Sequence, residues 1–429
     1  MSEMKTIMRW IVPVSVLSAF LGFLAVSRNG NNVCLTFEDY YTNRDLNNNC
    51  YYNPEFLLEV PEIVRRKGYP LEEYPVTTED GYTLTVFRIP HGKESKGKKK
   101  RKPIFLQHGM TLNSGIYVNI GNKSLAYILA DAGYDVWLGN FRGSMYSKNH
   151  SKLSVNDEEF WNYTFHENGV YDIPSQLNIV YNITQQKVIF IGYSLGSTAV
   201  YIYSSLFPEA AKDRIDIIIN FAPSIYTEEV GKLFTLVGYM WWLLETPAQL
   251  IFKGKIYVRQ PIPFDAVKML CLPFPFQMRM CQLLEMTALG FNFAQNDPET
   301  LPITILHNTD TASIKSITHF IQIGFSKRFQ YFDYGVARNL KLYNTTNPPL
   351  YNLSKVQVPT YTFAGKNDLA VSQKSLDRLY EELPRETLRY GVYHVEDINF
   401  SHLNFITAKD IVPLVYEHLL KFLENFLQF

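Results

Sequence analysis

The chain has no excess charge of either sign and few cysteines. Its 429 residues include 41 basic and 41 acidic side chains, so the formal net charge is zero and gives no argument for nucleic acid or strongly charged partners. No internal repeat or extended low-complexity segment interrupts the sequence. The four cysteines form two close pairs, and neither spacing is that of a zinc site. We therefore expect a globular protein that binds no nucleic acid and holds no metal.

The most informative motif is the pentapeptide G-Y-S-L-G at residues 192–196. An apolar run at 187–191 leads into it, and a helix-like stretch follows. A serine on a sharp strand-to-helix turn has its hydroxyl lifted clear of the sheet, and the flanking glycines are needed because the turn is strained and crowded. The motif therefore predicts a nucleophile elbow that carries Ser194.

The acid and the base of an α/β-hydrolase follow the nucleophile in the order Asp or Glu, then His. A β-type run at 358–364 ends in a turn that presents Asp368. Of the three later histidines, His394 lies in a strand-like segment and His418 in a helical pattern. His402 lies in a loop just before the last helix, where the base must be. We therefore predict Asp368 as the acid and His402 as the base.

Two backbone N–H groups are predicted to bind the oxyanion. One belongs to Leu195, directly after the nucleophile, and the other to Met110, which follows a buried-strand run at 103–107 and a glycine. We expect His108, at the end of that strand, to be structural. An imidazole takes the serine proton and returns it to the leaving alcohol, so these groups predict a serine hydrolase that uses neither metal nor cofactor.

Several longer motifs together resemble those of the acid lipase family of gastric and lysosomal lipases. They are T-T-E-D-G-Y-T-L at 77–84, L-Q-H-G at 106–109, L-A-D-A-G-Y-D-V-W-L-G-N at 129–140 with R-G at 142–143, E-F-W at 159–161, Y-D-I-P at 171–174 and H-L-N-F at 402–405. The resemblance runs from about Pro61 to the C-terminus. It implies the triad Ser194, Asp368 and His402, with the amides of Met110 and Leu195 at the oxyanion.

The sequence departs from the family pattern at three positions near these residues. Tyr193 and Leu195 stand where the family usually has His and Gln, and Asn404 stands where it tends to have Asp. Because the oxyanion donor is a backbone N–H, we expect Leu195 to change substrate preference or rate without removing catalysis. We expect Asn404 to weaken the support of the base.

The expected fold is an α/β-hydrolase, with a mostly parallel central sheet flanked by helices and a large, mainly helical cap inserted late in the chain. The predicted divisions are 1–27 as signal peptide or anchor, 28–223 and 358–429 as the two parts of the core, and 224–357 as the cap. Apolar residues make up 46% of the chain, enough for a large core and a lipid-facing cleft. The cap is expected to cover the serine in water and open at a lipid surface, with the bond-breaking groups wholly outside it. The basic run at 96–102 is interpreted as a solvated hairpin loop.

The N-terminus predicts entry into the secretory pathway. A positively charged flank precedes an apolar stretch at 10–26, which fits a signal peptide cleaved after Ser27, or else an uncleaved anchor because of its length. Cys34 with Cys50 and Cys271 with Cys281 are disulfide candidates, with free thiols as the alternative. The second pair resembles a cysteine pair in the family's cap.

Asn-x-Ser/Thr sequons are more numerous than a cytosolic chain of this size needs. A seventh, at Asn399, is set aside because a glycan beside His402 would obstruct the site. The glycosylation candidates are Asn122, Asn149, Asn162, Asn182, Asn344 and Asn352.

Two function classes follow from the sequence. The first is a secreted or lysosomal serine lipase or esterase that hydrolyses carboxylic esters of lipids, triacylglycerol or steryl ester, through an acyl-enzyme at a lipid–water interface, with no obligate protein partner. The alternative is a lipase-fold protein that binds or carries lipid with little turnover. Ser, Asp and His in the correct order favour the enzyme.

Overall fold

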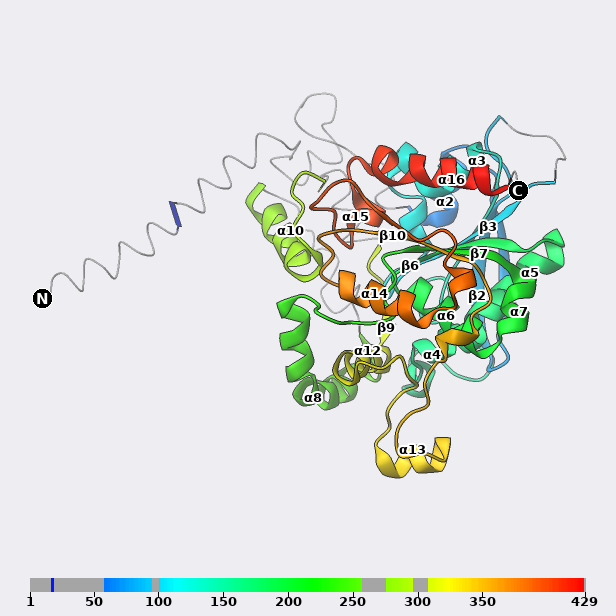
Figure 1. The fold of residues 1–429 in the computed structure, drawn as a ribbon. Helices are drawn as coiled ribbons and strands as arrows, with labels where there is room; N and C mark the ends of the chain where they lie inside the picture. Colours follow the sequence, from blue (N-terminus) through cyan, green and yellow to red (C-terminus); the bar gives the residue numbers. More distant parts are fainter. Residues whose placement is uncertain (1–16, 19–57, 95–99, 257–274, 296–307, 428–429) are drawn as a thin grey trace, which may run out of the picture.

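The computed structural model describes residues 17–18, 58–94, 100–256, 275–295 and 308–427. This part of the chain forms a nine-stranded, mostly parallel sheet with helices on both faces (Figure 1). The strand order is β1-β2-β4-β3-β6-β7-β10-β11, and β5 pairs with β2. The architecture is the α/β-hydrolase fold expected from the sequence.

The strands differ in direction between the edge and the centre of the sheet. Those from β4 to β11 in the sheet order run parallel, whereas β1 and β2 are antiparallel to their neighbours. The strands of the large sheet are β1 (Glu72–Thr77), β2 (Tyr82–Ile89), β3 (Pro103–Gln107), β4 (Asp135–Gly139), β5 (Asn149–His150), β6 (Val188–Tyr193), β7 (Ile215–Phe221), β10 (Thr360–Ala364) and β11 (Val392–His394).

The helices and short turns of the described chain complete the element list. The helices are α2 (Val60–Arg66), α3 (Leu125–Asp131), α4 (Phe165–Glu167), α5 (Ile173–Thr184), α6 (Leu195–Leu206), α7 (Pro208–Arg214), α8 (Lys232–Phe252), α10 (Pro275–Leu289), α12 (Ile314–Ser326), α13 (Val336–Tyr343), α14 (Gln373–Glu382), α15 (Asn404–Thr407) and α16 (Glu417–Leu427). The 3-10 and π turns are η3 (Ser114–Tyr117), η4 (Gly121–Lys123), η5 (Glu159–Trp161), η6 (Asn168–Asp172), η8 (Leu353–Lys355), η9 (Arg385–Thr387) and η10 (Val412–Tyr416).

The interpretation of residues 96–102 as a hairpin loop is wrong. The strands on either side, β2 and β3, do not pair, because β4 lies between them and pairs with both. The chain therefore crosses from the antiparallel edge to the parallel centre at this point, which a hairpin cannot do. Residues 95–99 themselves lie outside the described residues.

The two faces of the sheet are covered by different helices. Ile104 and Leu106 belong to an apolar cluster with residues of α2, α3 and α16, whereas Phe105 belongs to a second cluster with residues of α5 and α6. Successive side chains of a strand point to opposite faces, so a strand buried on both faces is apolar throughout. Continuous apolar runs such as that of β3 therefore predicted central strands correctly.

The chain between β7 and β10 leaves the large sheet and forms the helices α8, α10, α12 and α13, together with the two-stranded β8 (Lys255–Ile256) and β9 (Ala312–Ser313). Figure 1 shows α8, α10 and α12 gathered on one side of the core, while α13 projects from it. The side chain of Trp241 in α8 donates a 2.9 Å hydrogen bond from Nε1 to Thr318 Oγ1 in α12. These helices lie within the predicted cap at 224–357.

The structure bears in part on the predicted N-terminal segment, the cysteine pairs and the glycosylation sites. In the described ranges, no helix is both long and apolar enough to cross a membrane. The predicted signal peptide or anchor at 1–27 lies outside the described residues apart from 17 and 18. Cys281 is disulfide-bonded, whereas Cys34, Cys50 and Cys271 lie outside the described residues. All six glycosylation candidates are exposed, as a glycan requires: Asn122, Asn149, Asn162, Asn182, Asn344 and Asn352.

Candidate active site

Ser194 lies at the sharp turn between β6 and α6. Its backbone has φ 52° and ψ −113°, a region that residues other than glycine rarely adopt. A Cβ atom on Gly192 would lie 2.7 Å from the Ser197 nitrogen, and one on Gly196 would lie 2.3 Å from the Gln107 oxygen. Neither glycine leaves room for a side chain, so the strained turn depends on both.

The three residues predicted as nucleophile, base and acid lie together in the structure. Ser194 Oγ is 3.0 Å from His402 Nε2, and His402 Nδ1 is 2.9 Å from Asp368 Oδ2. The second oxygen of Asp368 accepts hydrogen bonds from the backbone N–H groups of Ala370 and Val371, both at 2.8 Å. With its Nδ1 proton directed to the carboxylate, His402 presents Nε2 as the acceptor for the serine proton.

The two histidines set aside in the sequence analysis lie elsewhere. His418 Nε2 is 2.7 Å from the Tyr361 hydroxyl, and its ring stacks on Tyr393 with centroids 3.7 Å apart. His394 is the last residue of β11. In the described part of the chain, neither is hydrogen-bonded to Ser194.

The two residues whose amides are predicted to bind the oxyanion line the same small cavity. Met110 and Leu195 both line a cavity of about 30 Å³. A Cβ atom on Gly109 would lie 3.1 Å from the Cβ of Ser194, so the loop after β3 passes directly beside the nucleophile. The Leu195 side chain is buried against the apolar cluster formed with α5 and α6. The predicted donors are thus the backbone N–H groups of the loop after β3 and of the first residue of α6, which lie on either side of the nucleophile.

Family models match two overlapping parts of the chain. The first, a partial alpha/beta-hydrolase lipase region, matches residues 60–121, and the second, the alpha/beta hydrolase fold, matches residues 102–245. Human lipase member K is 33% identical over 88% of this chain and 93% of its own length. The chain belongs to the acid lipase family. Other members are human lysosomal acid lipase/cholesteryl ester hydrolase, 32% identical over 87% of this chain and 92% of its own, and human gastric triacylglycerol lipase, 33% identical over the same shares.

Membership in the acid lipase family makes the chain a carboxylic ester hydrolase of the α/β-hydrolase fold. Ser194, His402 and Asp368, joined by the hydrogen bonds from Ser194 to His402 and from His402 to Asp368, suit that chemistry. Within the described ranges, no cluster of three or more His, Cys, Asp or Glu side chains could hold a metal ion.

His108 holds the loop on the oxyanion side of this acid lipase in place. Its Nδ1 donates to the carbonyl of Gly109 at 2.8 Å, and its Nε2 accepts the backbone N–H of Phe141 at 3.1 Å. Burial lowers the pKa of His108 to about 4. Both nitrogens of a neutral imidazole are therefore used by the backbone, and His108 joins the loops after β3 and β4.

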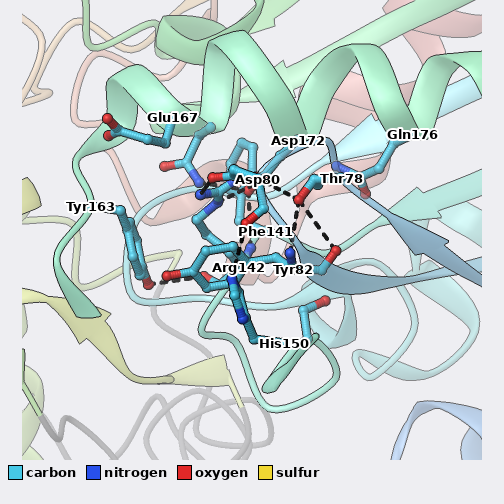
Figure 2. A network of polar contacts seen from close by, with 12 residues as sticks. Thr78, Asp80, Tyr82, Phe141, Arg142, His150, Tyr163, Glu167, Asp172 and Gln176 are labelled. Atoms are coloured by element: carbon cyan, nitrogen blue, oxygen red, sulfur yellow. Dashed lines mark hydrogen bonds and ion pairs between the residues drawn. The ribbon is translucent and has the colours of Figure 1, made fainter. Parts of the chain in front are cut away.

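A network of ion pairs surrounds Arg142, next to Phe141 in the chain (Figure 2). Arg142, the residue after Phe141, donates from Nε to Asp172 Oδ1 at 2.8 Å and from NH2 to Asp80 Oδ1 at 2.9 Å. Its guanidinium carbon lies 4.1 Å from the ring centre of Tyr82. Although burial alone would lower it, the two carboxylates raise the pKa of Arg142 well above its usual value. The loop that carries Phe141 is thereby fixed to the core.

A backbone group of the predicted cap contacts the two loops that carry the predicted base and acid. The carbonyl of Leu289, the last residue of α10, accepts the N–H of His402 at 3.2 Å and that of Leu369, next to Asp368, at 3.4 Å. A Cβ atom on Gly290 would lie 2.1 Å from the Asn367 oxygen. Ser194, Asp368 and His402 lie outside the predicted cap at 224–357, but the cap backbone at Leu289 joins the loops that carry the acid and the base.

The departures from the family pattern at Tyr193 and Asn404 both have structural roles. The Tyr193 hydroxyl donates to the His402 carbonyl at 3.2 Å, and the two rings lie 5.2 Å apart. The side-chain oxygen of Asn404 accepts from the Ser401 backbone N–H at 2.8 Å and from Asn292 Nδ2 at 3.0 Å. An amide oxygen therefore still orders the loop that carries the base.

One polar neighbour of the nucleophile was missed by the sequence analysis. Ser224 Oγ lies 3.1 Å from Ser194 Oγ. Ser224 closely follows β7, which pairs with β6 in parallel. The carboxyl ends of neighbouring parallel strands meet at one edge of a sheet, so the polar residue after β7 was the signal that could have found it.

Proposed function

We propose that this acid lipase is a secreted or lysosomal enzyme that hydrolyses triacylglycerol or steryl esters through an acyl-enzyme on Ser194. The observation that carries the proposal is the chain of hydrogen bonds from Ser194 through His402 to Asp368, at 3.0 and 2.9 Å. The named relatives include a gastric triacylglycerol lipase and a lysosomal cholesteryl ester hydrolase, which supports these two lipid classes and these two locations.

The proposed reaction begins at the ester carbonyl. Ser194 Oγ attacks the carbonyl carbon while its proton passes to His402 Nε2, and the amides of Met110 and Leu195 hold the oxyanion. Collapse of this intermediate releases the alcohol, which takes the proton from His402. A water molecule then repeats the sequence on the acyl-enzyme and releases the fatty acid.

Exposed apolar side chains along α8 support action at a lipid–water interface. A soluble protein seldom exposes so many large apolar groups on one helix without a partner for them. Trp241 faces inward to α12, whereas Trp242 is 73% exposed and Leu250 is 77% exposed. The exposed set on α8 is Leu233, Phe234, Leu236, Val237, Tyr239, Met240, Trp242, Leu243, Leu244, Leu250 and Ile251.

The nucleophile is tested with Ser194→Ala, and the base with His402→Ala. Both variants should lose nearly all ester hydrolysis, while the matched variants His394→Ala and His418→Ala should keep most of it. Rates are measured on a panel of esters that varies acyl length and head group, at pH 5 and pH 7. Activity above a few per cent of wild type in Ser194→Ala would refute the proposal.

The interface is tested by replacing two exposed residues of α8, in the variant Trp242→Ser with Leu250→Ser. Burying each side chain in lipid stabilises the bound state by about 1.5 to 3 kcal/mol, so we expect at least a tenfold loss on emulsified triacylglycerol. Hydrolysis of soluble p-nitrophenyl butyrate should change less than twofold. Leu342→Ser on α13, where Leu342 is 52% exposed, is the control. An equal loss on both substrates would contradict the docking role.

The location is tested by treating the protein secreted from an animal cell line with an N-glycosidase. A fall in mass to that of the unmodified chain is expected. A chain that carries no glycan, or that stays in the cytosol, would contradict the secretory location.

A further inference from the structure

Ser224 places a second hydroxyl beside the nucleophile. The two oxygens, Ser224 Oγ and Ser194 Oγ, are 3.1 Å apart, and Ser224 is only 6% exposed. Within the described chain, Ser194 is the one hydrogen-bond partner of the Ser224 hydroxyl. A buried hydroxyl directed at a reacting atom is not needed for packing, because alanine would fill nearly the same space.

The position of Ser224 is fixed by the same elements that form the elbow. Its carbonyl accepts a 2.8 Å hydrogen bond from Thr198 Oγ1, in the first turn of the helix that starts at the nucleophile. The backbone N–H of Ser194 donates to the carbonyl of Phe221 at 3.0 Å, and Ala222 then turns the chain with φ 48°. The two hydroxyls therefore belong to one rigid unit.

The direction of the hydrogen bond follows from the proton count. In the neutral imidazole that serves as the base, Nδ1 carries the proton directed at Asp368 and Nε2 is the acceptor, so Ser194 is the donor in the 3.0 Å contact. Ser194 has one proton, and that proton is used. The 3.1 Å contact with Ser224 therefore has Ser224 as the donor and Ser194 Oγ as the acceptor.

We propose that Ser224 is a further catalytic residue, which donates its hydroxyl proton to a hydrogen bond with Ser194 Oγ as that oxygen leaves the acyl group during deacylation. The proposal rests on the function proposed above, in which Ser194 is the nucleophile. A hydrogen bond speeds a step only when it is stronger in the transition state than in the state before it.

The two half-reactions differ in that respect. Before acylation, Ser194 Oγ is a hydroxyl oxygen and already a good acceptor, so the bond changes little when Oγ attacks. In the acyl-enzyme, Oγ is the alkoxy oxygen of an ester, a poor acceptor. As the bond between Oγ and the acyl carbon breaks, Oγ gains negative charge, and the hydrogen bond from Ser224 becomes stronger.

The atoms balance in the proposed step. Water adds to the acyl carbon and gives one proton to His402 Nε2. The tetrahedral intermediate then collapses, its carbon–Oγ bond breaks, and the electron pair goes to Oγ, which takes that proton back from His402. Ser224 keeps its own proton throughout, so its role is to stabilise the departing oxygen.

The experiment is pre-steady-state hydrolysis of p-nitrophenyl butyrate by Ser224→Ala. Removing one neutral hydrogen bond that is stronger in the transition state should slow deacylation by about tenfold, which corresponds to about 1.4 kcal/mol. We expect a full burst of one p-nitrophenolate per active site, a steady-state kcat about tenfold below wild type, and a kcat/KM changed less than threefold. Equal losses of kcat and kcat/KM, or no loss of either, would overturn the proposal.

Two matched variants and a titration complete the test. Ser205→Ala removes another buried hydroxyl, whose partner is the Ile202 carbonyl at 2.9 Å, and should leave both constants unchanged. Ser224→Cys keeps a weaker donor and should restore part of kcat. A fluorophosphonate probe reacts with the active nucleophilic serine and so measures the fraction of active sites. We expect full labelling of Ser224→Ala. Loss of labelling in this variant alone would refute a role confined to deacylation. Absence of labelling in the wild type would instead refute Ser194 as the nucleophile.

Discussion

The ion pair between Arg142 and Asp172 predicts a large and specific loss of stability in Asp172→Asn. Both side chains are almost wholly buried, at 1% and 0% exposure. All four contacts of the Asp172 carboxylate are with donors: Nε, NH2 and the backbone N–H of Arg142, and Nδ2 of Asn168. An asparagine replaces one of these acceptors by an NH₂ group, which would face a donor.

The loss of unfolding free energy depends on the contacts that Arg142 keeps in Asp172→Asn. Removing one partner of a buried ion pair costs about 3 to 5 kcal/mol, and the lower end applies because Asp80 still contacts Arg142 at 2.9 Å. With an unfolding entropy of about 2.1 cal/mol/K per residue, a chain of 429 residues loses roughly 0.9 kcal/mol of stability per degree. We therefore expect Asp172→Asn to lower Tm by about 3 °C.

The assay is thermal unfolding followed by circular dichroism, with an exposed ion pair as control. Arg65 and Glu73 are 2.6 Å apart but 56% and 42% exposed. Glu73→Gln should therefore shift Tm by less than 1 °C, because exposed pairs contribute about 0 to 1 kcal/mol. The reasoning is refuted if Asp172→Asn melts within 1 °C of wild type, or if the two variants lose the same stability.

Three further predictions concern the cap, the pH dependence and the oxyanion side. Gly290→Ala should lower kcat on a soluble ester at least tenfold, because the added Cβ would lie 2.1 Å from the backbone oxygen of Asn367, the residue before Asp368. The control is Gly335→Ala, where the added Cβ meets nothing within 4 Å and kcat should not change. Equal kcat in the two variants would contradict the support that α10 gives to the acid loop. Burial lowers the pKa of His319 to about 3, so below about pH 6.5 the unfolded chain binds a proton that the folded chain does not, and stability falls as pH falls. His319→Gln should remove about 2 kcal/mol of that loss at pH 5. The measurement is the fall of Tm between pH 7 and pH 5, which should be shallower in the variant, and an unchanged slope would refute the prediction. Leu195→Gln should shift acyl-chain preference in the ester panel by less than about tenfold, because the backbone donor stays, and complete inactivity would show that the oxyanion loop had moved.

The central strands and the elbow could be predicted from the sequence, because the patterns that indicate them are formed by residues close together in the chain. The apolar run at 103–107 coincides with β3, and the run that enters the elbow became β6. Chain order left three histidines after Asp368, and its place in a loop just before the last helix selected His402, which the structure brings to Ser194. Each of these inferences used residues that are neighbours in sequence or an order that the fold imposes.

The features that could not be predicted from the sequence depend on contacts between segments that are far apart in the chain. The pairing of β4 between β2 and β3 could not be read from either neighbour, so the hairpin interpretation failed. Ser224 lies 30 residues from Ser194, and only the parallel pairing of their strands brings the hydroxyls together. The support that Leu289 gives to His402 comes from a backbone carbonyl, which carries no residue-specific signal at all.

The carbonyl of Leu289 also has a consequence for how such an enzyme diverges. The helix α10 lies outside the large sheet, yet the peptide group at its end contacts the loops of both the base and the acid. We therefore expect substitutions that tilt α10 to change turnover together with substrate range. Adaptation to new lipids should accumulate away from this helix end, while the peptide after Leu289 tolerates little change.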